Sequence, residues 1–155
     1  MFTTSRTRPV LLAVSSGGGH WVQLQRLSAA FDGAEVHYAT TDATAADATN
    51  RGRVHVYPDA NKDTPLRLIV CILRIAWIVL RVRPDVVIST GAAGGFLAIR
   101  FARLIGARTM FIDSIANARE LSISARLALG VADRVLSQWP RVAETSGAEY
   151  RGAVI

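Results

Sequence analysis

Short apolar runs and helix-like patterns alternate along this chain of 155 residues. Val10–Val14 is an uninterrupted apolar run, which is typical of a strand buried on both faces of a parallel sheet. Apolar positions then recur at helical spacing from Trp21 to Phe31, so a helix is expected to begin near His20. Continued along the chain, the pattern predicts strands at residues 10–14, 35–39, 53–57, 86–88, 109–112 and 134–137, and further helices at 66–82, 96–105 and 121–131.

The predicted helix at residues 66–82 is apolar except for Arg67, Arg74 and Arg81. Arginines at this heptad spacing form one narrow stripe, which drifts by only about 20° per step. A crossover helix that covers a sheet needs an apolar face of a little over ~100°, so this helix has apolar surface to spare. One interpretation is a helix lying in the plane of a membrane surface, with its arginines toward headgroup phosphates and Trp77 toward the acyl chains.

Two other interpretations of this helix stand beside the in-plane one. A crossover helix buried in protein, with its arginines at the surface, fits the same pattern. A transmembrane helix is disfavoured, because about 17 residues at ~1.5 Å each fall short of a ~30 Å hydrocarbon core. Arg74 would also lie in the middle of that core.

A glycine run, Ser15-Ser16-Gly17-Gly18-Gly19-His20, separates the first predicted strand from the first helix. Backbone N–H groups of such a loop can close on a phosphate at the positive end of the helix. No Walker pattern follows, and the dinucleotide pattern has Val22 at its third glycine, so NAD is disfavoured although Asp42 lies near the distance of a ribose-binding acid. A tight turn that needs glycine only for its conformation is the alternative.

A second loop of small residues, Ser89–Gly95, follows the fourth predicted strand. Two such loops, after the first and fourth strands, predict a doubly wound parallel sheet whose order reverses between these strands, with ligands bound at that switch point. Asp113 follows the fifth strand and should face the same edge of the sheet. It could act as a base or bind a sugar hydroxyl, or it could be a helix N-cap or surface acid.

Composition narrows the possible chemistry. A length of 155 residues fits a single α/β domain, and one cysteine, Cys71, leaves no internal disulfide. His20, His37 and His55 lack metal-ligand spacing, so no metal site is expected, and His37 and His55 are interpreted as structural.

Charge and the amino-terminal residues bear on partners and location. The net charge of +6 comes from arginines, with Lys62 as the only lysine, and favours an anionic partner. The basic residues are dispersed and no nucleic-acid-binding motif is present, so a membrane surface is favoured over nucleic acid. Residues 1–9 precede an apolar run too short for a secretory signal, which predicts a cytoplasmic chain with or without membrane contact.

Several short motifs together resemble one family of proteins. They are Ser15–His20, Ser89-Thr90-Gly91-Ala92, Asp113-Ser114-Ile115-Ala116 with Leu121-Ser122, Ala132-Asp133-Arg134, Gln138-Trp139-Pro140 and Gly147-Ala148-x-Tyr150-x-Gly152. In this order and spacing the chain resembles the small membrane-associated subunit of two-chain glycosyltransferases. That family includes the eukaryotic subunit that helps add the second N-acetylglucosamine to dolichol pyrophosphate, and bacterial capsule and exopolysaccharide enzymes.

The resemblance implies the Rossmann-like, acceptor-binding amino-terminal half of a GT-B glycosyltransferase, here expected over residues 1–155, with a separate chain supplying the half that binds the UDP-sugar. The segment 147–155 is then expected at the partner interface. Gln23 stands where the eukaryotic subunit has an acid, and Asp113 where it has a glutamate. The eukaryotic subunit's amino-terminal membrane anchor is not expected here, which leaves the arginine-striped helix as the membrane contact of a peripheral protein at the cytoplasmic face.

The implied reaction transfers a sugar, N-acetylglucosamine or a related hexose, from UDP to a sugar carried on a polyprenyl pyrophosphate, with no further cofactor. His20 and Asp113 are the rival candidates for the base. The residues expected to bind the acceptor or its phosphates are Ser16, Gly17, Gly18, Gly19, Thr90, Gly91, Ala92, Ser114 and Gln138, and those expected at the membrane are Arg67, Arg74, Trp77 and Arg81. Two alternatives are a non-catalytic subunit that recruits a partner to the membrane, and a free-standing nucleotide-binding domain.

Overall fold

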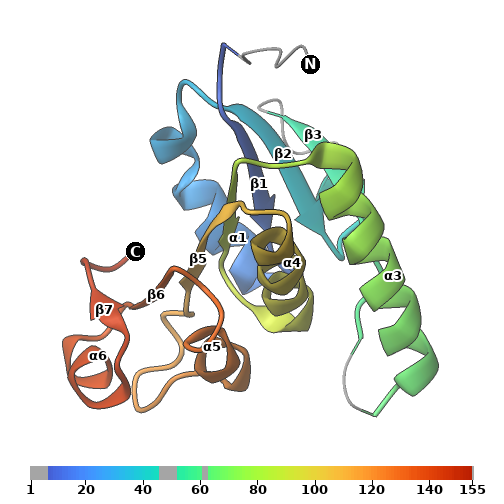
Figure 1. Cartoon of the computed structure of the whole chain (residues 1–155). Coiled ribbons are helices and arrows are strands. Elements are labelled where there is room, and N and C mark those ends of the chain that lie inside the picture. Colours follow the sequence, from blue (N-terminus) through green and yellow to red (C-terminus); the bar gives the residue numbers. More distant parts are fainter. Residues whose placement is uncertain (1–6, 46–51, 61–62, 155) are drawn as a thin grey trace.

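The computed structural model describes residues 7–45, 52–60 and 63–154, and these build a parallel β-sheet covered by helices (Figure 1). Seven strands are found in this part of the chain. They are β1 (Val10–Val14), β2 (Glu35–Thr40), β3 (Arg53–Val56), β4 (Val86–Ser89), β5 (Arg108–Ile112), β6 (Arg134–Ser137) and β7 (Glu149–Tyr150).

The strands lie in the order β3-β2-β1-β4-β5-β6-β7, and every neighbouring pair is parallel. The order therefore reverses between β1 and β4, as the two small-residue loops predicted. Val14 at the end of β1 is the register partner of Ser89 at the end of β4, and Ser89 is in turn the partner of Phe111 in β5. The loops that follow β1, β4 and β5 consequently leave the same edge of the sheet side by side.

The helices are divided unequally between the two faces of the sheet (Figure 1). Helix α1 (Gly19–Arg26) and the 3₁₀ helix η1 (Ser28–Phe31) cover one face. The other face is covered by α3 (Pro65–Val82), α4 (Ala92–Leu104), α5 (Ile123–Ala128) and α6 (Pro140–Ser146).

Strand β1 contributes side chains to both hydrophobic cores. Leu12 and Val14 pack in the core under α3 and α4, while Leu11 and Ala13 pack in the core under α1. All five β1 residues are buried, so the expectation that its continuous apolar run is covered on both faces is confirmed. Tyr38 and Phe111 are the largest fully buried side chains, one in each core.

The observed elements differ from the predicted ones mainly in the second half of the chain. Helix α4 begins at Ala92 rather than at residue 96, because small residues let its first turn pack directly on the sheet. A Cβ atom at Gly95 would collide with the Ser89 hydroxyl. Helix α6 and strand β7 were not predicted, since elements of seven and two residues are too short to show a period.

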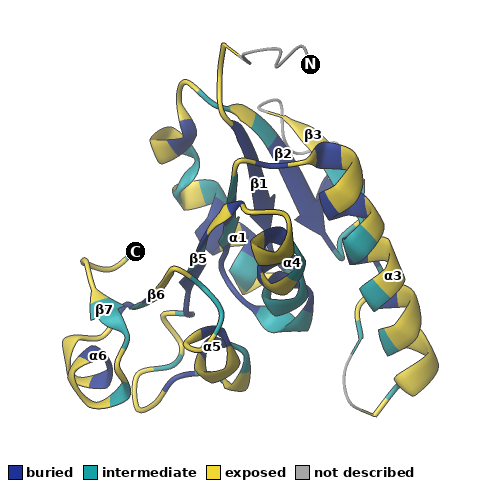
Figure 2. Cartoon of the chain, in the orientation of Figure 1, coloured by how far each residue is buried: buried dark blue, intermediate teal, exposed yellow. Residues whose placement is uncertain are grey.

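Helix α3 is apolar on two opposite faces. The face toward the sheet buries Cys71, Ile75, Ile78, Val79 and Val82. The outer face is still apolar, although its residues are exposed. Figure 2 shows exposed residues along the length of α3. We call this outer face the apolar stripe, and it consists of Leu66, Ile69, Val70, Leu73, Trp77 and Leu80.

The three arginines of α3 lie along one flank of the apolar stripe. Arg74 Nε donates to the Val56 carbonyl at 3.0 Å, and its guanidinium lies 4.7 Å from the centre of the Trp77 ring. Among the described residues, no helix is both long enough and apolar enough to cross a membrane. The inner face of α3 thus packs on the sheet as in an ordinary crossover helix. Its outer face carries the additional apolar surface that the sequence predicted.

Candidate functional site

The loops after β1 and β4 are joined by two hydrogen bonds between His20 and Thr90. His20 Nδ1 lies 2.9 Å from the Thr90 carbonyl oxygen, and the Thr90 hydroxyl donates to the His20 carbonyl at 2.8 Å. A carbonyl oxygen only accepts, so Nδ1 must carry the proton of this hydrogen bond. In the neutral imidazole, Nε2 then keeps its lone pair and can accept a proton.

Gly91 is required for this contact. It is buried with φ = +142°, and a Cβ atom there would lie 2.5 Å from the His20 ring. The next residue, Ala92, has φ = +67°, a conformation that is strained for any residue except glycine. The backbone after β4 therefore stores strain directly beside the histidine.

Two hydrogen bonds hold the backbone of the glycine loop after β1. The Tyr57 hydroxyl donates to the Ser15 carbonyl at 2.9 Å, and the Gly17 N–H donates to Thr41 Oγ1 at 2.9 Å. Burial raises the pKa of Tyr57 well above its ordinary value, with smaller contributions from Cys71 and Asp59, so the hydroxyl stays neutral and able to donate. Sequence reasoning did not assign this role to Tyr57.

The tip of the loop is open. Gly18 has φ = +64°, and both Gly18 and Gly19 are exposed with no atoms within 4 Å of an added Cβ. The Gly17 amide is already bound to Thr41, so of the three predicted amides those of Gly18 and Gly19 are better placed to meet a ligand. Phosphate binding by Ser16 and these glycines stays a prediction.

Asp42, the candidate ribose-binding acid, organises its own turn. Its Oδ1 accepts from the Thr44 hydroxyl at 2.7 Å and from the Thr44 N–H at 2.9 Å. These two bonds, the side-chain one first, lower the pKa of Asp42. The carboxylate therefore holds the loop after β2, and the expectation about a dinucleotide site stays a prediction.

Asp113 is buried, and both of its carboxylate oxygens are in use. Oδ1 accepts from the Asn117 side-chain amide at 2.9 Å, and Oδ2 accepts from the Ser122 N–H at 2.9 Å. The N-cap of α5 is Ser122, whose hydroxyl accepts from the Ala125 N–H at 3.0 Å. Asp113 thus holds the loop from Ser114 to α5, and its action as a base stays a prediction that this geometry does not favour.

Two buried glutamines meet at the backbone carbonyl of Asp113. Gln138 Nε2 donates to this oxygen at 2.9 Å, and Gln23 Nε2 donates to it at 3.4 Å. The other end of the Gln138 amide accepts from the Val154 N–H at 2.7 Å. Both ends of Gln138 are therefore bound to backbone, and its predicted contact with the acceptor is untested.

Gln23 is a positioning residue that sequence reasoning missed. The signal that could have found it was its departure from the acid of the eukaryotic family pattern. An ionised carboxylate cannot donate to the Asp113 carbonyl, whereas the glutamine amide does. Because Gln23 and His20 lie on the same helix, α1 connects the histidine to the loop after β5.

The sheet order and the loops at its reversal define a class of protein. They describe a Rossmann-like α/β domain that presents a histidine, a glycine loop and a strained small-residue loop at its switch point.

Solved structures share this fold. MurG from Acinetobacter baumannii superposes with a TM-score of 0.69 at 15% identity, covering 96% of this chain and 44% of that one. UDP-N-acetylglucosamine 2-epimerase from Rickettsia bellii superposes with a TM-score of 0.72 at 12% identity, covering 94% and 45%.

The family is shown by sequence. Residues 59–154 match the family described as oligosaccharide biosynthesis protein Alg14 like, and the chain belongs to that family. A curated relative is the UDP-N-acetylglucosamine transferase subunit ALG14 of Yarrowia lipolytica, which is 36% identical over 81 residues. That match covers 47% of this chain and only 37% of the relative, so the chain spans little more than a third of the relative's length.

Replacing Gly91 with alanine should displace the His20 ring, because the added Cβ would lie 2.5 Å from it. We expect the imidazole resonances of His20 to shift in NMR spectra while the fold is retained. Gly106→Ala is the matched control, since Gly106 also has a positive φ, +82°, but nothing lies within 4 Å of the added Cβ. Unchanged His20 resonances in Gly91→Ala would contradict the contact.

Proposed function

We propose that this chain is the acceptor-side subunit of a two-chain, UDP-sugar-dependent glycosyltransferase. In the proposed reaction a sugar, N-acetylglucosamine or a related hexose, passes from UDP to a sugar on a polyprenyl pyrophosphate. Membership of the Alg14-like family and a fold matching 44% of MurG support this proposal. The observation that carries it is the histidine held at the switch point by Thr90.

His20 is the proposed general base. The hydrogen bond from Nδ1 to the Thr90 carbonyl fixes the tautomer and leaves Nε2 to accept a proton from the acceptor hydroxyl as the new glycosidic bond forms. The same bond restrains the ring, and this preorganisation lowers the entropy cost of reaching the reactive geometry.

The acceptor's pyrophosphate is proposed to lie at the exposed tip of the glycine loop. Gly18 and Gly19 stand at the amino end of α1, where the helix dipole and free N–H groups favour an anion. Thr90, Gly91 and Ala92 would form the opposite wall, since they follow the neighbouring strand β4.

Asp113 is proposed to position the acceptor loop rather than to take the proton. Its bonds to Asn117 and Ser122 hold the loop that contains Ser114. Gln138 links the Asp113 carbonyl to the Val154 amide, so the segment 147–154, which we propose lies at the partner interface, is connected to the same loop.

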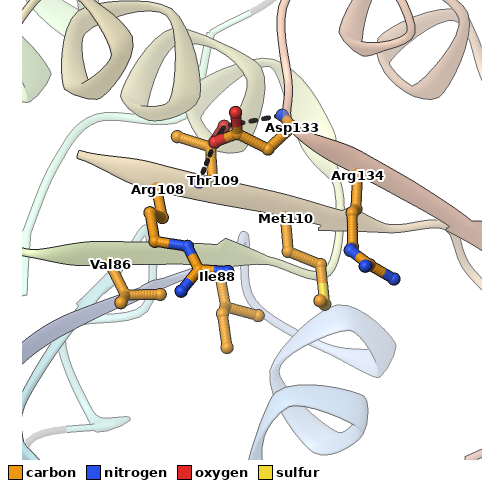
Figure 3. Close-up of a pocket in the computed structure, with 7 residues that line it drawn as sticks. All are labelled: Val86, Ile88, Arg108, Thr109, Met110, Asp133 and Arg134. Atoms are coloured by element: carbon orange, nitrogen blue, oxygen red, sulfur yellow. Dashed lines mark hydrogen bonds between the residues drawn. The ribbon is translucent and has the colours of Figure 1, made fainter. Parts of the chain in front are cut away.

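A partner surface is proposed on the sheet face that α1 leaves partly open. A cavity of about 210 Å³ lies there over β4, β5 and β6. Figure 3 shows Val86, Ile88, Met110, Arg108 and Arg134 projecting to this side, and Met110 belongs to neither hydrophobic core. An apolar floor between two arginines suits a donor-subunit segment with apolar and acidic side chains.

The apolar stripe of α3 is the proposed membrane contact of a peripheral protein. A crossover helix runs antiparallel to its strands, so the amino end of α3 lies at the edge of the sheet that carries the candidate site. The stripe could then rest on the acyl-chain region while the lipid-linked acceptor reaches the switch point from the same membrane.

Removal of the His20 imidazole tests the proposed reaction. In complex with the donor subunit, His20→Ala should lower kcat for transfer from UDP-N-acetylglucosamine to a polyprenyl-pyrophosphate-linked N-acetylglucosamine by about 100-fold or more, the usual contribution of a general base. Val22→Ala, an exposed change on the same helix, should leave kcat unchanged. Complex formation is measured alongside by gel filtration.

Two results, one from this experiment and one from a separate binding measurement, would favour other functions. Normal transfer by an intact complex containing His20→Ala would mean that the partner supplies the chemistry and that this chain only recruits it. Tight binding of UDP or NAD to this chain alone, measured by isothermal titration, would instead favour a free-standing nucleotide-binding domain.

Met110→Glu tests the proposed partner surface by placing a charge on its apolar floor. We expect at least a tenfold weaker association with the donor subunit, measured by biolayer interferometry, because the new carboxylate would interrupt the apolar floor and repel the partner's acidic side chains. Leu104→Glu is the control, since Leu104 is 68% exposed at the end of α4 on the opposite face of the sheet. Equal affinities of the two variants for the donor subunit would contradict the proposed partner surface.

A further inference from the structure

A polar cavity lies at the edge of the sheet opposite the candidate site. Its volume is about 380 Å³. It opens between the first residues of β1, β2 and β3 and the last turns of α3. Its lining residues are Val10, Glu35, His37, Arg53, His55, Trp77, Arg81 and Val82. No role in the proposed reaction accounts for this cluster, because strand amino ends and strand carboxyl ends lie on opposite edges.

Positive charge dominates the wall of this cavity. Arg53 comes from β3 and Arg81 from α3, and both side chains are exposed. Arg74 does not line the cavity, but its charge acts on His55, which does, and its side chain is bound to the Val56 carbonyl at the end of β3. Glu35 is the acid among the lining residues, and its carboxylate lies 3.2 Å from His37 Nε2. Arginine forks are suited to phosphate oxygens, which they can bind in a bidentate manner.

The two histidines form a hydrogen-bonded pair in the wall. Their rings stack with centroids 5.3 Å apart, and His37 Nδ1 lies 3.0 Å from His55 Nε2. Glu35 accepts from His37 Nε2, so in the neutral pair His55 Nε2 donates to His37 Nδ1. Burial lowers the pKa of His55, and the neighbouring His37, Arg74 and Arg53 lower it further. These surroundings favour the neutral form of His55, and a bound anion would favour its protonation.

The cavity adjoins the proposed membrane surface of α3. Trp77 belongs to both, since it lines the cavity and is also 49% exposed on the apolar stripe. A tryptophan between a polar recess and an apolar surface occupies the position that this side chain prefers at the boundary between headgroups and acyl chains. Among the described residues no group of three metal-ligating side chains is found, so the histidine pair is not assigned to a metal.

We propose that this cavity binds the phosphate of an anionic phospholipid, with the headgroup held by Arg53 and Arg81 and the acyl chains lying along the apolar stripe. The proposal rests on the proposed membrane-facing role of α3. It adds a specific lipid site, distinct from the acceptor site at the other edge of the sheet. Protonation of His55, which lines the cavity, would add one positive charge facing the phosphate, so binding should strengthen as the pH falls.

Vesicle flotation compares variants that each remove one positive charge. With phosphatidylcholine vesicles containing phosphatidylglycerol, Arg67→Gln should weaken binding about fivefold, the effect of one basic residue near an anionic surface. Arg53→Gln and Arg81→Gln should each weaken it tenfold or more, because each also removes a direct contact with phosphate. Arg67 is the matched control, since it lies on the same arginine stripe but does not line the cavity.

The pH dependence gives an independent readout. The phosphodiester of phosphatidylglycerol does not titrate between pH 5.5 and 7.5, roughly the range in which a histidine can change its charge. Binding of the unmodified chain should strengthen across this range as the pH falls, and His55→Gln should remove most of that change. The other charged groups that face the pair are Glu35, Arg53, Arg74 and Arg81.

A soluble ligand separates a lipid site from a phosphate site. Short-chain phosphatidylglycerol, kept below its micelle concentration, should shift the Trp77 indole resonance saturably, and inorganic phosphate should do so more weakly. Equal affinity for phosphate would overturn the assignment to a lipid. Equal losses for Arg67→Gln and Arg81→Gln, with Arg53→Gln unchanged, would overturn the site itself. These measurements use neither donor sugar nor partner, so their failure is distinguishable from failure of the transfer reaction.

Discussion

The contact between His20 and Thr90 is the interaction on which the candidate site depends. It joins the loops of two strands that are adjacent in the sheet but separated by some 70 positions in the sequence. The contact exists because β1 pairs with β4 at the reversal of the strand order, and because glycine at position 91 leaves room for the imidazole. This packing arrangement thereby sets the position and the tautomer of the histidine and restricts the motion of its ring.

A second group of buried polar contacts surrounds Asp113. Its carboxylate holds the loop that leads to α5, and its carbonyl accepts from glutamines on α1 and after β6. Gln138 in turn accepts a hydrogen bond from the Val154 N–H, so the Asp113 contacts extend to the carboxyl-terminal segment. The proposed acceptor loop and the carboxyl-terminal segment are therefore joined by hydrogen bonds, and helix α1, which carries both Gln23 and His20, connects them to the histidine. This arrangement offers a physical route by which a partner bound at that segment could influence the acceptor loop.

The sequence predicted those parts of the fold that depend on local periodicity. The order reversal followed from two small-residue loops, and the apolar surplus of α3 followed from three arginines in a heptad register. The departure from the family acid marks Gln23 in the sequence, but the partners of Gln23 and Tyr57 could not be predicted. These partners are the carbonyls of Asp113 and Ser15, which are distant in sequence and carry no side-chain signal. The same limit applies to Asp113, whose sequence context fits a base as well as the loop anchor seen in the structure.

The tautomer of His20 tests the proposed mechanism most directly. Long-range ¹H–¹⁵N NMR spectra at a pH where the imidazole is neutral distinguish a protonated Nδ1 from a protonated Nε2. We expect a proton on Nδ1, bound to the Thr90 carbonyl, and an unprotonated Nε2. A neutral ring with its proton on Nε2 would break the bond to Thr90 and leave no base facing the acceptor, which would contradict the proposed mechanism.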